Sequence, residues 1–235
     1  MKTKKEKFLL SRRFAAIALA MGLVGFAAKL AVIFTYDGRL AVEYPDLISK
    51  WNFFGFYTYT TNILVDFWLV LIALAIFLKR EKMAALLAKA TVQAFLTVMI
   101  FSVGAMYCGV LVWYDKLYSW GLWWGNFATL WHHAVTPVFM ACLFFRPADR
   151  AKLGQKDLWA WLMYPLAYLV VTLLRGGMVN WYPYPFFDQA WEMFAQMNID
   201  PRLGVSLASA FVAAFITTLG LLAIALHNRM IEKRP

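Results

Sequence analysis

The chain has 235 residues, of which 63% are apolar and 15% are charged, and its formal net charge is +10. This composition leaves too little polar surface to cover a soluble globule of this size, so we expect an integral membrane protein. The apolar runs are continuous rather than alternating, which disfavours a membrane β-barrel.

Six apolar runs are long enough to cross a hydrocarbon core of roughly 30 Å as helices. The first begins with basic residues like a signal peptide but has a longer apolar run, so we expect an uncleaved anchor. No long linker divides the chain, and we predict an all-α fold with a single domain over residues 1–235. The predicted spans cover about 14–35, 54–78, 90–113, 122–145, 158–174 and 203–226, and the fifth is the shortest.

Basic residues are distributed unequally between the two ends of these spans. Sixteen Lys and Arg residues fall at the N-terminus, in the second and fourth connections and in the C-terminal tail, against five in the other connections. This asymmetry predicts that both termini lie in the cytoplasm. A basic rim beside anionic lipid headgroups also accounts for the net charge, so no nucleic-acid partner is expected.

The second span carries a polar face. Thr58, Asn62 and Asp66 recur every four residues, so they share one side of a helix over about 12 Å. Exposing that side to lipid would be costly, and it should therefore face the interior of the bundle.

A histidine pair and a lysine lie at a similar depth in other spans. His132 and His133 belong to the fourth span and Lys29 to the first. A threonine hydroxyl needs a base to become a nucleophile, and a neutral imidazole suits that role. Thr58 with one of the histidines therefore predicts a catalytic pair. The alternative is a hydrogen-bonded network that only holds the helices together.

The other polar residues of this set have supporting roles. Asn62 and Lys29 are candidates for stabilising an oxyanion. Asp66 could orient the imidazole or neutralise Lys29, and the second role is favoured because a carboxylate in a membrane needs a counter-charge. Adjacent histidines on a helix point about 100° apart, and no further ligand cluster accompanies them, so no metal or other cofactor is expected.

The fifth span adds three candidates. Tyr164 and Tyr168 share a helix face and either line the same cavity or serve aromatic packing. Arg175, at the outer end of the span, either caps the helix and binds headgroups or pairs with a substrate carboxylate. Pro137 and Pro165 lie inside spans, where they are expected to kink the helix and open room for a ligand.

Four segments, in order along the chain, also carry a resemblance. They read YTYTTNILV at 57–65, HHAVTP at 132–137, WLMYPLAY at 161–168 and YPYPFFD at 182–188. Together they resemble the family of androgen-induced protein and androgen-dependent TFPI-regulating protein, with its six-span bacterial relatives. The resemblance implies an intramembrane hydrolase with a Thr nucleophile and a His, located in the inner membrane of a bacterium. For animal members it implies lipid ester substrates, notably fatty acid esters of hydroxy fatty acids.

The resemblance can be carried over only at matching positions. The aromatic–Thr step in the second span places the nucleophile on Thr58 rather than on the threonines that follow. The bacterial spacing of His to Pro selects His133, whereas the animal spacing selects His132, so both remain candidates. Animal members have a carboxylate shortly after the Thr, where this chain has Thr61 and Asn62. The identity of the substrate is therefore not carried over.

The sequence thus predicts an intramembrane hydrolase of lipid-like esters. The ester enters laterally between helices, Thr58 attacks its carbonyl carbon, and His133 or His132 acts as base and then as acid. The alternative is a non-enzymatic lipid-binding or small transporter-like protein that uses the same polar face. The expected partners are a lipid or fatty-acid ester substrate and membrane lipids, and the oligomeric state is left open.

Overall fold

The computed structural model describes residues 11–35, 52–111 and 123–233. In these ranges it has no strands, and six helical segments are long and apolar enough to cross a membrane, which confirms the predicted all-α fold. The spans consist of α2 (Arg12–Thr35), α5 (Tyr57–Phe77), α7 (Ala90–Met106) followed by η2 (Tyr107–Leu111), α9 (Trp123–Leu130) followed by η3 (Trp131–Val135) and α10 (Thr136–Phe144), α11 (Gln155–Val179) and α13 (Pro201–Glu232). The basic residues Lys2, Lys4, Lys5 and Lys7 and the predicted span ends at 112–113 and 122 lie outside the described residues.

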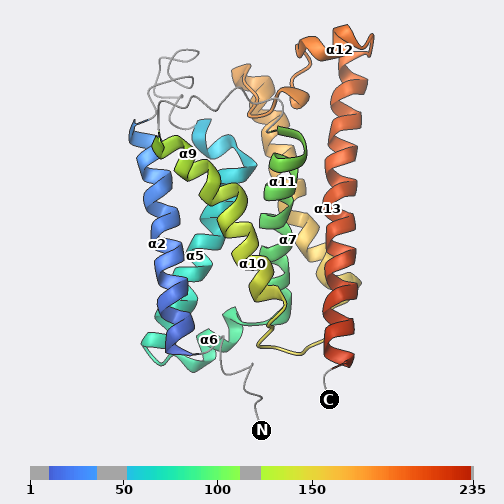
Figure 1. The fold of residues 1–235 in the computed structure, drawn as a ribbon. Helices are drawn as coiled ribbons and strands as arrows, with labels where there is room; N and C mark the ends of the chain where they lie inside the picture. Colours follow the sequence, from blue (N-terminus) through green and yellow to red (C-terminus); the bar gives the residue numbers. More distant parts are fainter. Residues whose placement is uncertain (1–10, 36–51, 112–122, 234–235) are drawn as a thin grey trace.

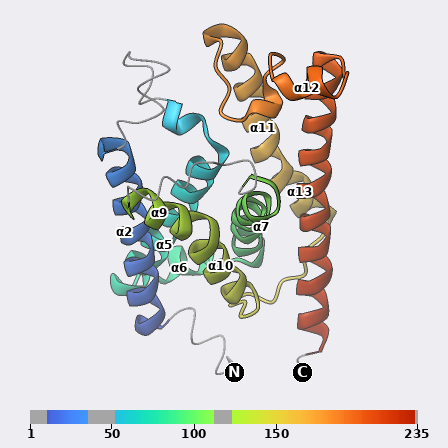
Figure 2. The same cartoon turned by 45° about the horizontal axis from the view of Figure 1, so that its top comes forward.

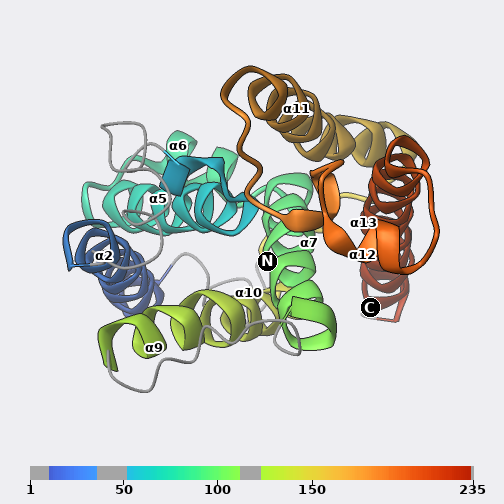
Figure 3. The same cartoon turned by 90° about the horizontal axis from the view of Figure 1, so that it is seen from above.

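The helices form two groups that meet at α7 (Figures 1 and 3). One group contains α2, α5 and the α9–α10 span, and the other contains α11 and α13, which lie side by side. The start of α2, the short helix α6 (Glu81–Leu87) and the end of α13 lie at one end of the bundle (Figure 1). At the opposite end, α12 (Glu192–Gln196) lies next to the start of α13 (Figure 2).

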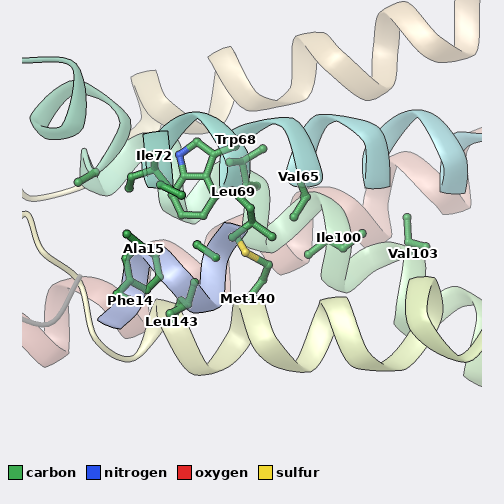
Figure 4. Packing of buried hydrophobic residues seen from close by; sticks show 14 residues of the cluster. Phe14, Ala15, Val65, Trp68, Leu69, Ile72, Ile100, Val103, Met140 and Leu143 are labelled. Atoms are coloured by element: carbon green, nitrogen blue, oxygen red, sulfur yellow. The ribbon is translucent and has the colours of Figure 1, made fainter. Parts of the chain in front are cut away.

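Two apolar clusters hold these groups together. The first fills the space between α2, α5, α7 and α10, where Leu69, Ile100 and Met140 are fully buried (Figure 4). The second joins α7 to α11 and α13 through residues such as Trp161 and Ile216. The outward faces of α11 and α13 remain apolar and exposed, as expected for helices that contact lipid.

The helix of the fifth span is longer than its predicted apolar run. The helix α11 has 25 residues and extends beyond the predicted 158–174 at both ends. Its start is stabilised by Asp157, whose carboxylate accepts a 2.9 Å hydrogen bond from the backbone N–H of Gly154. Its end is marked by Asn180 in the left-handed conformation, at φ 52°. Capping by polar residues, which hydropathy does not detect, therefore sets the length of this helix.

The fourth span contains a widened π-helical turn, η3, around its histidines. Pro137 has no N–H. It therefore cannot donate to the carbonyl of His132, as π-helical pairing would require, or to the carbonyl of His133, as α-helical pairing would require. The side-chain amide of Asn62 lies 3.4 Å from the His132 carbonyl and donates to it. The helix α7 approaches the His133 carbonyl at Gly104, where an added Cβ would lie 2.8 Å from that oxygen.

This close approach makes a testable prediction about stability. Gly104→Ala should force α7 and the η3–α10 segment apart and destabilise the fold by about 1–3 kcal/mol. Gly109→Ala is the matched control, because a Cβ at Gly109 meets no atom within 4 Å. Thermal unfolding of both variants in detergent measures the difference. Equal stability of the two variants would contradict the close contact at Gly104.

Candidate functional site

An apolar chamber of about 290 Å³ lies where the two helix groups meet. Its walls come from the start of α5, from α7, α11 and α13, and from the short turn η4 (Pro185–Phe187). Two residues proposed from the sequence line it, Thr58 and Tyr168, and so does Pro165 inside α11. The structure therefore gives Thr58 a cavity of the kind that an apolar ligand requires.

Thr58 lies at the N-terminus of α5, which has no cap from its own side chains. Two phenols replace that cap. The hydroxyl of Tyr168 accepts a 3.1 Å hydrogen bond from the backbone N–H of Tyr57 and donates to the carbonyl of Gly55 at 2.7 Å. The hydroxyl of Tyr184 lies 3.4 Å from both the backbone nitrogen and the Oγ1 of Thr58. Groups that a helix start usually exposes to water are thus satisfied by neighbouring segments.

The other aliphatic hydroxyls that line the chamber are already satisfied. Ser102, Ser209 and Thr217 each donate to a backbone carbonyl three or four residues earlier in their own helix, at 2.7–2.8 Å. These hydroxyls therefore offer little to a ligand. The polar end of the chamber is the pair formed by Thr58 and Tyr184.

Tyr184 is the residue that the sequence reasoning missed. In the sequence, the segment from Tyr182 to Asp188 appeared only as a motif of the resemblance, and Tyr184 was given no role at the site. The structure instead turns Tyr184 inward onto Thr58, and Phe186 and Phe187 next to it line the chamber. Loss of hydration raises the pKa of Tyr184, so its phenol stays protonated and able to donate.

Tyr164 has a different role from Tyr168. Its hydroxyl contacts the hydroxyls of Thr60 and Thr61 at 3.2 and 3.1 Å. This contact ties α11 to α5 beside the chamber, and Tyr164 is not among the lining residues. Of the two readings of the tyrosine pair, the cavity therefore applies to Tyr168 and packing to Tyr164.

The two histidines face different neighbours. The Nδ1 of His133 lies 2.9 Å from the carbonyl of Thr129, and its ring stacks on Tyr107 with centroids 3.8 Å apart. Because a carbonyl only accepts, Nδ1 carries the proton, which leaves Nε2 of His133 as a proton acceptor. His132 is buried at 1% exposure, and its Nε2 has no hydrogen-bond partner among the described residues.

The structure does not bring Thr58 into contact with either imidazole. No hydrogen bond among the described residues joins them, and neither histidine lines the chamber. The link is indirect. The amide of Asn62 donates to the backbone carbonyls of Thr58, at 2.9 Å, and of His132, at 3.4 Å. Thr58 and the π-helical turn with the histidines are therefore linked through the side chain of Asn62.

The remaining polar residues of the second span are used to hold helices together. Lys29 on α2 forms an ion pair with Asp66 on α5, which decides between the two predicted roles of Asp66. Lys29 also donates to the carbonyl of Gly25 at 3.3 Å, and Asp66 is fully buried. With Lys29 paired and the Asn62 amide bonded to two carbonyls, neither is free to stabilise an oxyanion at Thr58.

Arg175 binds neighbouring side chains of the protein. The helix α11 continues to Val179, so Arg175 lies one turn before its end rather than at its cap. Its guanidinium donates to the side-chain oxygen of Asn52 and lies over the ring of Trp181, 5.2 Å from the centroid. It is not among the residues that line the chamber, where a substrate carboxylate would need it. Arg175 ties α11 to the segment before α5.

Comparisons of this chain with models of protein families, with curated proteins and with solved structures give no match.

The buried ion pair makes a testable prediction. Lys29→Met should leave the Asp66 carboxylate buried without a counter-charge and destabilise the protein by about 3–5 kcal/mol. The double variant Lys29→Met/Asp66→Leu removes both charges and should recover most of that loss. Thermal unfolding in detergent compares the three proteins. A single variant as stable as the parent chain would show that the pair is dispensable.

Proposed function

We propose that this chain is an intramembrane hydrolase of lipid-like esters, with Thr58 as the nucleophile. The observation that supports it best is the position of the Thr58 hydroxyl at the polar end of an otherwise apolar chamber. Such a chamber suits the apolar part of a lipid, and the hydroxyl lies where an ester group at its end would come. Fatty acid esters of hydroxy fatty acids belong to this class of substrate.

The start of α5 offers the donors that the reaction needs. Attack on the carbonyl carbon leaves a negative charge on the carbonyl oxygen, and fixed donors aimed at that charge lower the barrier. The backbone N–H of Thr58 and the phenol of Tyr184 are the donors nearest to the nucleophile, and a bound ester must displace the hydrogen bonds that they make with each other. The positive end of the α5 dipole adds to their effect. These groups take the oxyanion role that sequence reasoning gave to Asn62 and Lys29.

We assign the base to His133, because its Nε2 is the acceptor nitrogen of an imidazole held in place by the Thr129 carbonyl. His133 takes the Thr58 proton as the Oγ1–carbon bond forms, and returns it to the alcohol that leaves. Water then attacks the acyl group on Thr58, which releases the acid and restores the hydroxyl. Since no described contact joins His133 to Thr58, a water molecule or a rearrangement on substrate binding must connect them.

We also propose that both termini lie in the cytoplasm of a bacterial cell and that the polar end of the chamber lies in the outer half of the inner membrane. The start of α2 and the end of α13 share one end of the bundle. Basic residues of the described chain gather at that end, including Arg12, Arg80 and Arg229. Thr58 begins α5 at the other end.

A second candidate is a lipid-binding protein without turnover. It is favoured by one observation, that the Thr58 hydroxyl is hydrogen-bonded to a phenol rather than to an imidazole. A protonated phenol donates well but is a poor base. The two functions share the chamber and differ in whether the bound ester is cleaved.

The nucleophile assignment is tested with purified protein in lipid nanodiscs and a panel of fluorogenic fatty-acyl esters. Thr58→Ala should lower kcat/KM by about 100-fold or more and abolish labelling by a phosphonate probe. Thr60→Ala, two residues away on the same helix, is the matched control and should retain both. Saturable ester binding without turnover in the parent chain would establish the second candidate instead.

The assignment of the base is tested by comparing His133→Gln with His132→Gln, which keep similar side-chain volumes. His133→Gln should lower kcat by about 10²–10⁴-fold with little change in stability. His132→Gln should change the unfolding temperature more than kcat, because His132 is fully buried away from the chamber. Steady-state kinetics and thermal unfolding measure both effects. The reverse ranking in kcat would move the base to His132.

A further inference from the structure

The chamber has one wall that faces out of the protein. On α11, the residues Trp159, Met163 and Leu166 line the chamber and are also 69%, 61% and 53% exposed. They follow one another at intervals of four and three residues, so they form one stripe along the helix. On α13, Ala213 lines the chamber and is exposed as well. The seam between α11 and α13 is therefore a border shared by the chamber and the surroundings of the bundle.

Three other sides of the chamber are covered. Ser102 and Val103 of α7 form its inner wall, and η4 covers its outer end, with Phe187 only 3% exposed. Toward the opposite end, α11 and α13 meet tightly, because a Cβ at Gly220 would collide with the side chain of Leu158. This contact closes the end of the chamber that lies opposite η4. The seam is thus open where these sides are closed.

The surroundings of the seam are set by the fold. Both α11 and α13 belong to the six helices that are long and apolar enough to cross a membrane. Exposed apolar side chains on such helices contact the acyl chains of the bilayer. The molecules that reach the seam first are therefore lipids already dissolved in the membrane.

We propose that one acyl chain of a bilayer lipid enters sideways between α11 and α13 and lies along this seam, with its ester beside Thr58. This inference rests on the proposed function for the fate of the ester but concerns binding, which turnover does not require. Trp159 and Leu169 both line the chamber and lie ten residue steps apart on α11, so the chain has a path of about 15 Å along this helix.

The size of the chamber limits the ligand to one chain. A cavity of ~150 Å³ lined by apolar side chains holds a molecule the size of benzene. The chamber here, at about 290 Å³, is roughly twice as large, which suits one extended chain rather than two packed together. A two-chain lipid would keep its second chain in the bilayer.

The experiment uses the full chain in vesicles of phosphatidylethanolamine and phosphatidylglycerol that contain a fatty acid with a photoreactive tail. Ala213→Trp fills the seam and should lower cross-linking to the α11 stripe at least about tenfold. Ala214→Trp is the matched control, since Ala214 is exposed on the same helix but does not line the chamber. Ala213→Leu, a smaller filler, replaces the tryptophan variant if that variant does not fold.

The outcomes separate this inference from the proposed function. Cross-linking that is equal in the Ala213 and Ala214 variants, or spread evenly over all exposed helices, overturns the seam as the route. Reduced cross-linking in Ala213→Trp, with Thr58→Ala still cross-linked to the photoreactive fatty acid as strongly as the parent chain, supports the seam as the route even if no ester is cleaved. If esters are cleaved, Ala213→Trp should lower the turnover of long-chain membrane esters more than that of short soluble ones.

Discussion

The exclusion of water from the membrane interior is the constraint on which this structure depends. A polar group inside the bundle must find its partner within the protein, because lipid offers none. The face of α5 shows how this is met: Asp66 pairs with Lys29, the Asn62 amide bonds two carbonyls, and two phenols cap the first N–H groups. Thr58 belongs to this face but also lines a cavity. It is the point where the network and a space for a ligand meet.

Most of the fold could be predicted from the sequence because continuous apolar runs of sufficient length have few alternatives to membrane helices. The pairing of Asp66 with Lys29 could also be predicted, since a buried carboxylate requires a cation. The ends of a helix could not be predicted where polar residues belong to it. The ends of α11 depend on Asp157 and Asn180, and an average of hydropathy treats both as loop residues. Capping geometry is a property of a few atoms, and no window average contains it.

The site was predicted only in part, because the sequence indicates how deep a residue lies in a span but not which way its side chain points. Counting residues from the ends of the spans placed Thr58 and the histidines in the same layer. It could not show which way each side chain points. Pro137 widens the turn around His132 and His133, and this shift in helical phase directs one ring toward Tyr107 and buries the other. Tyr184 was missed because its contact with Thr58 joins positions 126 residues apart, and depth along a helix does not apply to a loop residue.

The helix α13 is long enough to extend beyond the hydrocarbon core, where its last turns contact the segment before α11. Its 32 residues give about 48 Å of helix, which exceeds a hydrocarbon core of roughly 30 Å. On the last turns, the Asn228 amide pairs with both backbone groups of Leu153, at 3.0 and 2.9 Å, just before α11 begins. His227 adds a 3.0 Å contact to the carbonyl of Ala151. These hydrogen bonds hold the end of α13 to the segment before α11. Any separation of the two helices therefore hinges at these contacts and is widest near the other end of the bundle.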